Sequence, residues 1–119
     1  MKIVKKNQTK EFKNSETCIA IEYPTNDHDK DLNIAVIKLK KDRYPLKGWA
    51  VNEKCKEMSY VVKGKVKFVT ENSSTDLEEG DVVFIDVNEK YYWLGDCEMV
   101  MPCTPAWYPE QHKIVEASL

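Results

Sequence analysis

Short strand-like runs separated by turn residues dominate this sequence, and they constrain its fold more than any other feature. β-Branched and aromatic residues gather in these runs, and Gly, Pro, Asn or Asp follows most of them. Amphipathic helical periodicity is almost missing. Strands that recur every ~8–12 residues with turn chemistry between them are typical of an all-β sandwich or barrel. We therefore predict an all-β fold.

The boundaries of the expected strands follow from the turn residues. Lys63-Gly64-Lys65 is interpreted as a tight hairpin, because glycine accepts the positive φ that such turns need. Gly95-Asp96 is interpreted as a turn as well, and residues 43–45 as another. Pro109 opens a segment, 109–113, that predicts one helical turn. The strands are expected at 17–23, 32–40, 49–51, 58–62, 66–70, 82–85, 91–94 and 97–101.

The length of 119 residues suits a single domain that can bury a core without disulfide or metal staples. We expect this domain to span residues 17–119. Residues 1–16 are mostly polar and precede the first strong strand. We interpret them as a loose N-terminal arm or as an edge strand, and we favour an edge strand at 2–4 that pairs with a second subunit.

The charge balance excludes several classes of partner. The chain carries 18 basic and 20 acidic side chains, which gives a net charge of −2. Nucleic acids and anionic membranes are bound by clustered Lys and Arg, and here the basic residues alternate with acids. No apolar run approaches the ~20 residues of a membrane span, and residues 1–13 lack the apolar stretch of a signal peptide. We expect a cytoplasmic protein with no nucleic-acid or membrane partner.

The cysteines and histidines give little sign of metal or redox chemistry. The four cysteines form no CxxC pair, which argues against zinc-ribbon and thioredoxin-like sites. We expect them to pack as small buried hydrophobes. His28 lies among acidic residues in a polar loop, and we expect it on the surface. His112 is expected on the surface or at a dimer contact.

Two segments of the chain resemble motifs of the cupin superfamily. In the first, six residues separate Glu57 from Gly64, as in the E-x6-G end of the first cupin motif. In the second, Gly80-Asp81 follows Gly64 after sixteen residues and looks like the opening of the second motif. Together the segments cover residues 48–95. The resemblance implies a cupin-type jelly-roll β-barrel, or double-stranded β-helix, that forms a homodimer and has a pocket inside.

The histidines that bind metal in the resembled family have no counterpart here. The first two ligand positions fall on Val51 and Glu53, or one residue earlier in each case, and the later ligand histidine is replaced by Tyr91. Of the four family ligands only Glu57 remains. A catalytic metal needs about three converging imidazole or carboxylate donors. We therefore expect no cofactor and no transition metal, while Asn52, Glu53 and Glu57 leave a weak hard-cation site open.

The resemblance also places candidate site residues inside the barrel. Because alternate residues of a strand face the same side, Ser59 shares the face of Glu57, and Trp93 shares the face of Tyr91. A buried carboxylate should be hydrogen-bonded, with Tyr91 as one candidate partner. Aromatic faces beside a few polar groups suit a sugar-like or small organic ligand, although Tyr91 and Trp93 could equally fill the core. The candidate ligand-binding residues are Asn52, Glu57, Ser59, Tyr91 and Trp93.

Three functions are compatible with this pattern. The first is a metal-free module that binds a small molecule in the barrel. The second is a metal-independent enzyme, an isomerase, epimerase or lyase, in which Glu57 acts as general base and Tyr91 as general acid. The third is a metal-dependent cupin oxygenase. The sequence alone does not decide whether the protein is an enzyme.

Overall fold

The computed structural model describes residues 1–116, and this part of the chain forms nine strands and two short 3-10 helices. The prediction of an all-β fold is therefore confirmed. No helix in the described part is long and apolar enough to cross a membrane. The elements are η1 (Lys6–Gln8), β1 (Lys10–Lys13), β2 (Cys18–Glu22), β3 (Asn33–Tyr44), β4 (Trp49–Asn52), β5 (Lys56–Thr70), β6 (Ser74–Glu78), β7 (Val82–Ile85), β8 (Tyr91–Thr104), η2 (Pro109–Gln111) and β9 (His112–Val115).

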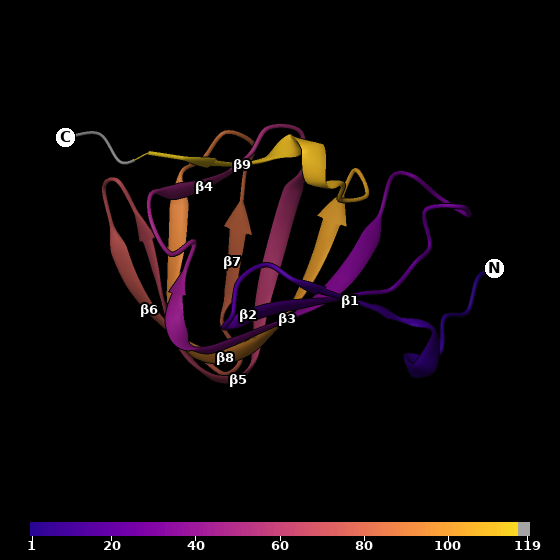
Figure 1. Ribbon diagram of the computed structural model, residues 1–119, viewed down its shortest axis with the longest axis horizontal. Coiled ribbons are helices and arrows are strands. Elements are labelled where there is room, and N and C mark those ends of the chain that lie inside the picture. The colour runs from indigo at the N-terminus through magenta and orange to yellow at the C-terminus, as the bar shows by residue number, and fades with distance from the viewer. Residues whose placement is uncertain (117–119) are drawn as a thin grey trace.

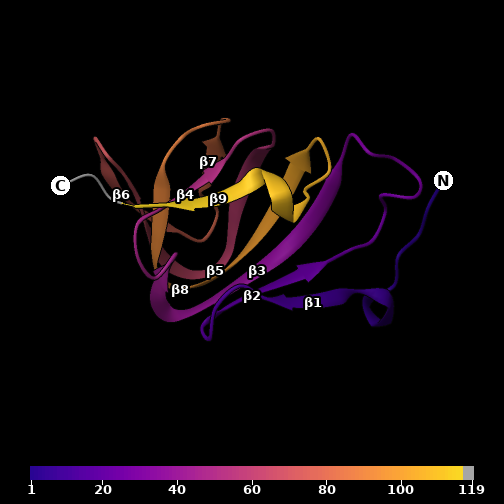
Figure 2. The same cartoon turned by 45° about the horizontal axis from the view of Figure 1, so that its top comes forward.

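The strands form one curled antiparallel sheet. Its order is β1-β2-β3-β8-β4-β9, and β5 pairs with β8 as well as with β6 and β7. Figure 1 shows the sheet bending round at the bottom while β4 and β9 cross the top, so that the two sides face each other. Figure 2 shows β1, β2 and β3 as the lower wall. The result is a jelly-roll barrel whose inner face is available for a core and a site.

The central strand β5 shows how the sequence sets the two faces of the sheet. Glu57, Ser59 and Val61 are buried and point into the barrel. This is the alternation expected for a strand with one face on the core. The residues between them point outward and are exposed, namely Met58, Tyr60 and Val62.

The hairpin predicted at Gly64 and the turn predicted at Gly95 are both wrong. Lys63-Gly64-Lys65 lies within β5, and Gly95-Asp96 lies within β8. A Cβ atom on Gly64 would lie 2.2 Å from the carbonyl oxygen of Asp96, and one on Gly95 would lie 2.5 Å from that of Lys65. The two glycines therefore allow β5 and β8 to approach closely, and no chain reversal occurs at either.

Other boundaries differ in smaller ways. The turn expected at 43–45 is wrong in position, because β3 continues to Tyr44 and the chain reverses after it. The helical turn expected from Pro109 is present as η2 and gives way to β9 at His112. Within residues 1–16 the edge strand is β1, whereas residues 2–4 have no regular secondary structure. The end of the expected domain, 117–119, lies outside the described residues.

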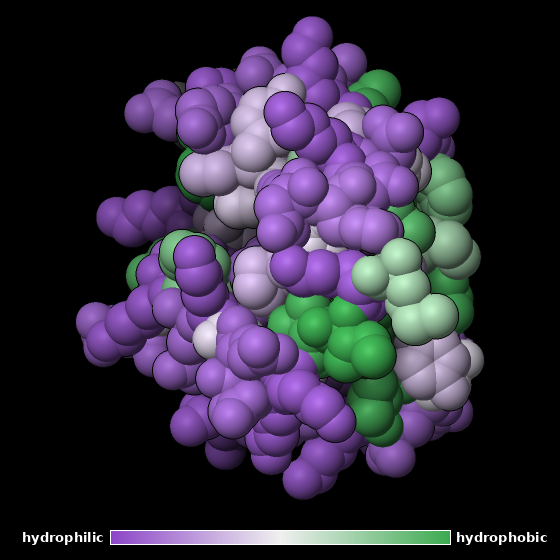
Figure 3. Space-filling model, turned by 90° about the vertical axis from the view of Figure 1, so that its right-hand side faces the viewer, coloured by the Kyte–Doolittle hydropathy of each residue, from purple (hydrophilic) through white to green (hydrophobic). Residues whose placement is uncertain are grey.

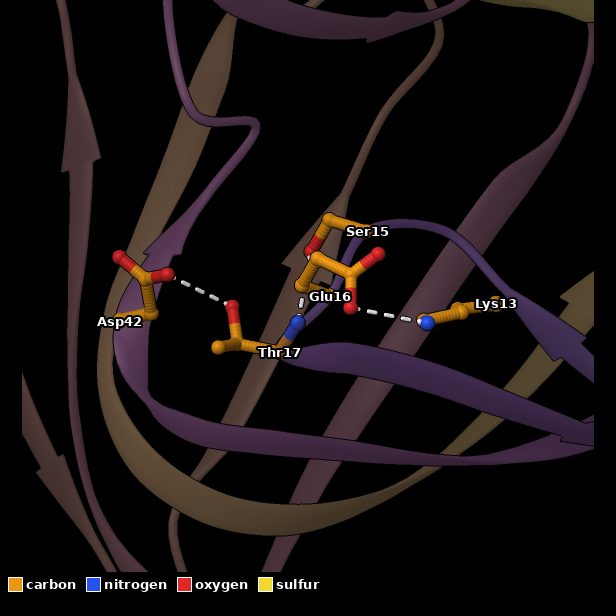
Figure 4. A network of polar contacts seen from close by, with 5 residues as sticks. All are labelled: Lys13, Ser15, Glu16, Thr17 and Asp42. Carbon is orange, nitrogen blue, oxygen red and sulfur yellow. Dashed lines mark hydrogen bonds and ion pairs between the residues drawn. The ribbon is translucent and has the colours of Figure 1, made fainter.

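The turn between β1 and β2 is hydrogen-bonded to β3. The hydroxyl of Thr17 donates a hydrogen bond to Asp42 over 2.7 Å, and its amide donates to the Ser15 hydroxyl over 3.3 Å (Figure 4). An exposed ion pair between Lys13 and Glu16, 2.9 Å long, closes the same turn. These contacts hold the β1–β2 hairpin along one side of the barrel.

The core fills the closed end of the barrel. Its buried members come from most of the strands, and the aromatic rings of Phe68, Tyr91 and Trp93 pack against one another there. All four cysteines are free and buried, as expected from the sequence. The buried cluster consists of Cys18, Leu39, Ala50, Val61, Val66, Leu77, Ile85, Tyr91, Trp93, Cys97, Met99 and Met101.

Candidate functional site

The open end of the barrel contains a cavity of about 790 Å³. This volume is within the ~300–1,000 Å³ typical of small-molecule sites. Small side chains on β2 and β3 create the space, since Ala20 and Ala35 face inward where larger residues would fill it. The floor is apolar and comprises Ala20, Ala35, Ile37, Leu39, Met99 and Met101.

Glu57 is the acidic group of the cavity wall that the sequence singled out. It lies on the inner face of β5 and is 8% exposed. Its carboxylate accepts a hydrogen bond from the amide of Asn52, which is wholly buried behind the wall. Burial raises the pKa of Glu57 above the ordinary value, and the Asn52 hydrogen bond offsets part of that effect. No hydrogen bond joins Glu57 to Tyr91 among the described residues.

A second carboxyl group, Glu22, faces the same cavity from the end of β2. Burial raises the pKa of Glu22 to about 7, and the negative charge of Glu57 adds to the shift. Glu22 was not among the site residues predicted from the sequence. The signal was present, because Cys18, Ala20 and Glu22 alternate along one strand and so share its inward face.

A chain of hydrogen bonds runs behind and along the wall. Asn52 lies opposite His112 in the β4–β9 pairing, and its Oδ1 atom is 2.8 Å from the His112 Nδ1 atom. The other ring nitrogen, Nε2, is 3.0 Å from the hydroxyl of Tyr44. Gln111 donates to the same Asn52 oxygen over 3.1 Å. Glu57, Tyr44 and His112 all line the cavity and are connected through Asn52.

His112, which was expected on the surface or at a dimer contact, belongs to the cavity lining. Its ring is half-buried in the cavity wall, between Tyr44 and Trp107, with centroid distances of 6.1 and 5.8 Å. Burial lowers the pKa of His112. The 60 residues that separate it from Asn52 hid this contact from the sequence analysis, since only the pairing of β9 with β4 brings them together. His28 is exposed in the loop after β2, as expected.

The remaining candidate residues divide between the wall and the core. Tyr91 and Trp93 line the cavity, with ring centroids 6.2 Å apart. Burial raises the pKa of Tyr91 well above its ordinary value. Ser59 lies outside the cavity lining, and its buried hydroxyl has no hydrogen-bond partner among the described residues. Asn52 also lies behind the lining, where it hydrogen-bonds to Glu57 and His112, which do line the cavity.

The side chains at the family's metal positions do not fit a metal ion. Asn52 offers one oxygen, which already accepts from Gln111 and His112. Tyr91 stays a neutral phenol because burial raises its pKa, and Glu53 is exposed. Within residues 1–116 no three His, Cys, Asp or Glu side chains converge as a ligand group. The donor set therefore fits neither a transition metal nor the hard-cation site left open by the sequence.

The mouth of the cavity has a different character from its interior. Lys2 and Lys10 lie at its rim with Phe12, and Lys2 forms a 3.0 Å ion pair with Asp27. The molecular face on this side, where the N-terminal segment lies, is mainly hydrophilic, with an apolar cluster low at its centre and further apolar groups along its right-hand edge (Figure 3). A ligand would therefore pass basic, exposed groups before it reached the carboxyl groups inside.

Comparisons with known proteins agree with this architecture. The family model of the EutQ-like cupin domain matches residues 47–96. No curated protein matches the sequence. Among solved structures, the Streptomyces nucleoside dehydratase Pac13, determined with uridine, has a TM-score of 0.83 at 16% identity and covers 98% of this chain and 91% of its own.

Two further structures extend the comparison. The polyketide cyclase RemF from Streptomyces resistomycificus has a TM-score of 0.74 at 15% identity, over 99% of this chain and 87% of its own. An RmlC-like cupin from Shewanella frigidimarina has a TM-score of 0.68 at 16% identity, and the match covers 85% of this chain and 87% of the Shewanella chain. At these identities the structures show a shared fold. Together with the domain match over residues 47–96, they show that the chain has the cupin fold.

Proposed function

We propose that this cupin binds a small, sugar-like organic molecule in its cavity and acts on it by general acid–base catalysis without a metal ion. The observation that carries the proposal is the pairing of two carboxyl groups of raised pKa, Glu22 and Glu57, in one cavity with aromatic walls. A pocket that only holds an apolar molecule has no need of one buried acid and one half-buried acid, because acids are costly to desolvate. Perturbed acids in a cleft are typical of catalytic sites.

Elimination of water or isomerisation is the reaction class that these groups suit. Both reactions need one group to remove a proton and another to protonate a leaving or shifting oxygen. Because burial favours the neutral form of Glu57, we assign it the role of proton donor, the reverse of the role expected from the sequence. The similar fold of a nucleoside dehydratase supports this class, and the uridine in that structure suggests nucleosides as the first compounds to test.

The binding step can be tested by thermal unfolding in the presence of uridine, other nucleosides, aldoses and sugar acids. We expect at least one class to raise the unfolding temperature in a concentration-dependent way, since a ligand at ~100 times its Kd stabilises the folded state by about 2.7 kcal/mol. Absence of any shift across the panel would contradict the proposal.

Two neighbouring positions on β3 provide matched variants for this test. Ala35→Trp fills the cavity floor, whereas Ile34→Trp adds the same side chain to the outer face of the strand. We expect the first variant to lose the ligand-induced shift and the second to keep it. Retention of binding in Ala35→Trp would place the ligand elsewhere.

The catalytic step has its own readout. For a compound that binds, Glu57→Gln should retain binding and lose turnover, followed by mass spectrometry as loss of water or as an isomer of equal mass. A protein that binds the compound and converts none of it would be a binding module, which is the first of the sequence-based hypotheses.

We also propose that a second copy of the chain covers the outer face of β5 and β7. Two apolar pairs lie side by side there, Met58 with Phe84 and Tyr60 with Val82, and all four are exposed. Exposed apolar patches of this kind often mark interfaces. Light scattering should give a dimer mass for the native chain and a monomer mass for Tyr60→Lys, with Leu46→Lys, in an exposed turn, as the control.

A further inference from the structure

We infer that Tyr44 and His112 act together as the general base of the site. Asn52 and Gln111 are positioning residues, because they hold the ring hydrogen of His112 on Nδ1. The inference rests on the acid–base function proposed above and names the group that takes the substrate proton. Tyr44 and His112 both line the cavity, and their side chains are 3.0 Å apart.

The orientation of the whole network starts from two backbone amides. The N–H groups of Lys54 and Cys55 donate to Gln111 Oε1 over 3.2 and 3.1 Å, so this atom is the amide oxygen. The other end of the Gln111 amide is therefore the NH₂ group, which donates to Asn52 Oδ1. Asn52 in turn directs its own NH₂ group at the Glu57 carboxylate.

This orientation determines the tautomer of His112. Asn52 Oδ1 can only accept, so the His112 Nδ1 atom 2.8 Å away must carry the hydrogen. A neutral imidazole has a hydrogen on one nitrogen and a lone pair on the other. Nε2 therefore accepts the hydroxyl hydrogen of Tyr44. The lone pairs of the Tyr44 oxygen remain free to accept a hydrogen bond from a substrate in the cavity.

The surroundings keep His112 in the neutral state that a base requires. Burial lowers its pKa, and within residues 1–116 no carboxylate hydrogen-bonds either ring nitrogen. The elements packed against the ring contribute Tyr44 from β3, Asn52 from β4 and Trp107 from the loop before η2. Glu57 reaches the ring only through Asn52, and Glu22 and Tyr91 face the same cavity from other strands.

The resulting proton transfer is balanced. A substrate C–H group next to a carbonyl carbon gives its proton to the Tyr44 oxygen while the phenolic proton of Tyr44 moves to His112 Nε2. The electron pair of the broken C–H bond forms an enolate, the His112 ring becomes an imidazolium, and Tyr44 is unchanged. Glu57 or Glu22 then protonates the departing hydroxyl group, so that the C–O bond breaks, a C=C bond forms and water leaves. The Tyr91 hydroxyl has no hydrogen-bond partner among residues 1–116, so no described base is in place to take a proton from it.

Nitrogen NMR tests this inference without any ligand. Only His28 and His112 contribute imidazole signals, and His112→Gln assigns them. Long-range ¹H–¹⁵N spectra of the labelled protein at neutral pH should show His112 with a protonated Nδ1 and an unprotonated Nε2. Its titration midpoint should lie below the ordinary histidine value of ~6.5. A protonated Nε2 in the native protein would overturn the inference and leave the proposed ligand binding intact.

Two variants test whether the hydrogen bond between Tyr44 and His112 and the one between His112 and Asn52 set the state of the His112 ring. Tyr44→Phe removes the hydroxyl donor, so the Nε2 resonance should shift while Nδ1 stays protonated. Asn52→Leu removes the acceptor at Nδ1, so the single tautomer should be replaced by a mixture. An unchanged Nε2 resonance in Tyr44→Phe would contradict the Tyr44 contact, and this variant keeps the test decisive if Asn52→Leu does not fold. A failed ligand panel, by contrast, would not alter either NMR result.

Discussion

The closed wall of the cavity, formed by Glu57 with Asn52, Gln111 and His112, differs in its physical chemistry from the mouth, where Lys2, Phe12 and Asp27 lie. In the closed wall, Asn52 and Gln111 are almost fully buried, and each side-chain amide has partners at both ends. At the mouth, Lys2 and Asp27 meet in an exposed ion pair, and Phe12 is 52% exposed. The wall consists of strands and the short helix η2, while much of the mouth consists of the N-terminal segment and the loop after β2.

This difference separates two tasks that a binding cavity must perform. Buried polar networks hold their members in one geometry, because a broken hydrogen bond in a region of low dielectric costs much more than one in water. Proton transfer needs such fixed geometry. Exposed groups at a mouth can adjust to a ligand, and their contacts open locally at little cost. We therefore expect catalysis to depend on the wall and ligand selection on the mouth.

The largest expected difference between the two regions is in the free energy of unfolding when an asparagine in each is replaced by leucine. Asn52→Leu removes the donor to Glu57 and the acceptor of Gln111 and His112. Buried polar groups left without partners cost about 1–3 kcal/mol each. We expect the free energy of unfolding to fall by about 3 kcal/mol, measured by urea denaturation.

The matched control is Asn26→Leu at the mouth, where the side chain is exposed. Surface substitutions of this kind change stability by about 0.5 kcal/mol or less. Similar losses in the two variants would show that the wall is no more cooperative than the mouth.

The strand faces could be predicted from the sequence, because alternation is a local property. It placed Glu57, Ser59 and Val61 on one inward face, and the structure agrees. The same rule would have included Glu22. The glycines misled the prediction for a physical reason: Gly64 permits a turn, but it also permits two backbones to approach closely, and only the neighbouring strand decides which use applies.

The tertiary part of the site could not be predicted in this way. The contact of Asn52 with Glu57 spans five residues and follows from the short connection between the end of β4 and the start of β5. The contacts of His112 with Asn52 and Tyr44 span 60 and 68 residues. A short strand after a 3-10 turn carries His112, and nothing in its local sequence specifies that this strand pairs with β4.

A smaller effect should distinguish the two regions by pH. The pKa of Glu22 is about 7 in the folded protein and near the ordinary value of ~4.3 in the unfolded chain. The folded state therefore holds this proton more tightly, and the Glu22 contribution to stability is lost as pH rises from about 4 to about 7. Glu22→Gln should be more stable relative to the native chain at pH 8 than at pH 4.

The stability of Glu22→Gln is compared with that of the native chain at each pH. Glu57 and His112 titrate in both proteins, so their contributions cancel to first order in the difference. Glu11→Gln, on the exposed strand β1, removes one carboxylate from the adjacent strand and serves as the control. A pH-independent difference for Glu22→Gln, measured by urea denaturation at both pH values, would mean that Glu22 is solvated like a mouth residue.

The smallest effect should come from the mouth itself. The hydrogen bond and positive charge of Lys2 hold the pKa of Asp27 below its usual value, and this pair connects the first residues to the loop after β2. Lys2→Ala should return the Asp27 pKa toward the ordinary range and speed hydrogen exchange in residues 3–5, with no measurable change in global unfolding, because exposed ion pairs are screened by water and salt. Lys13→Ala, which breaks the comparably exposed pair with Glu16 at the β1–β2 turn, should leave that exchange unchanged. A drop in global stability for Lys2→Ala would show that the mouth is part of the cooperative fold, and the contrast with the wall would then fail.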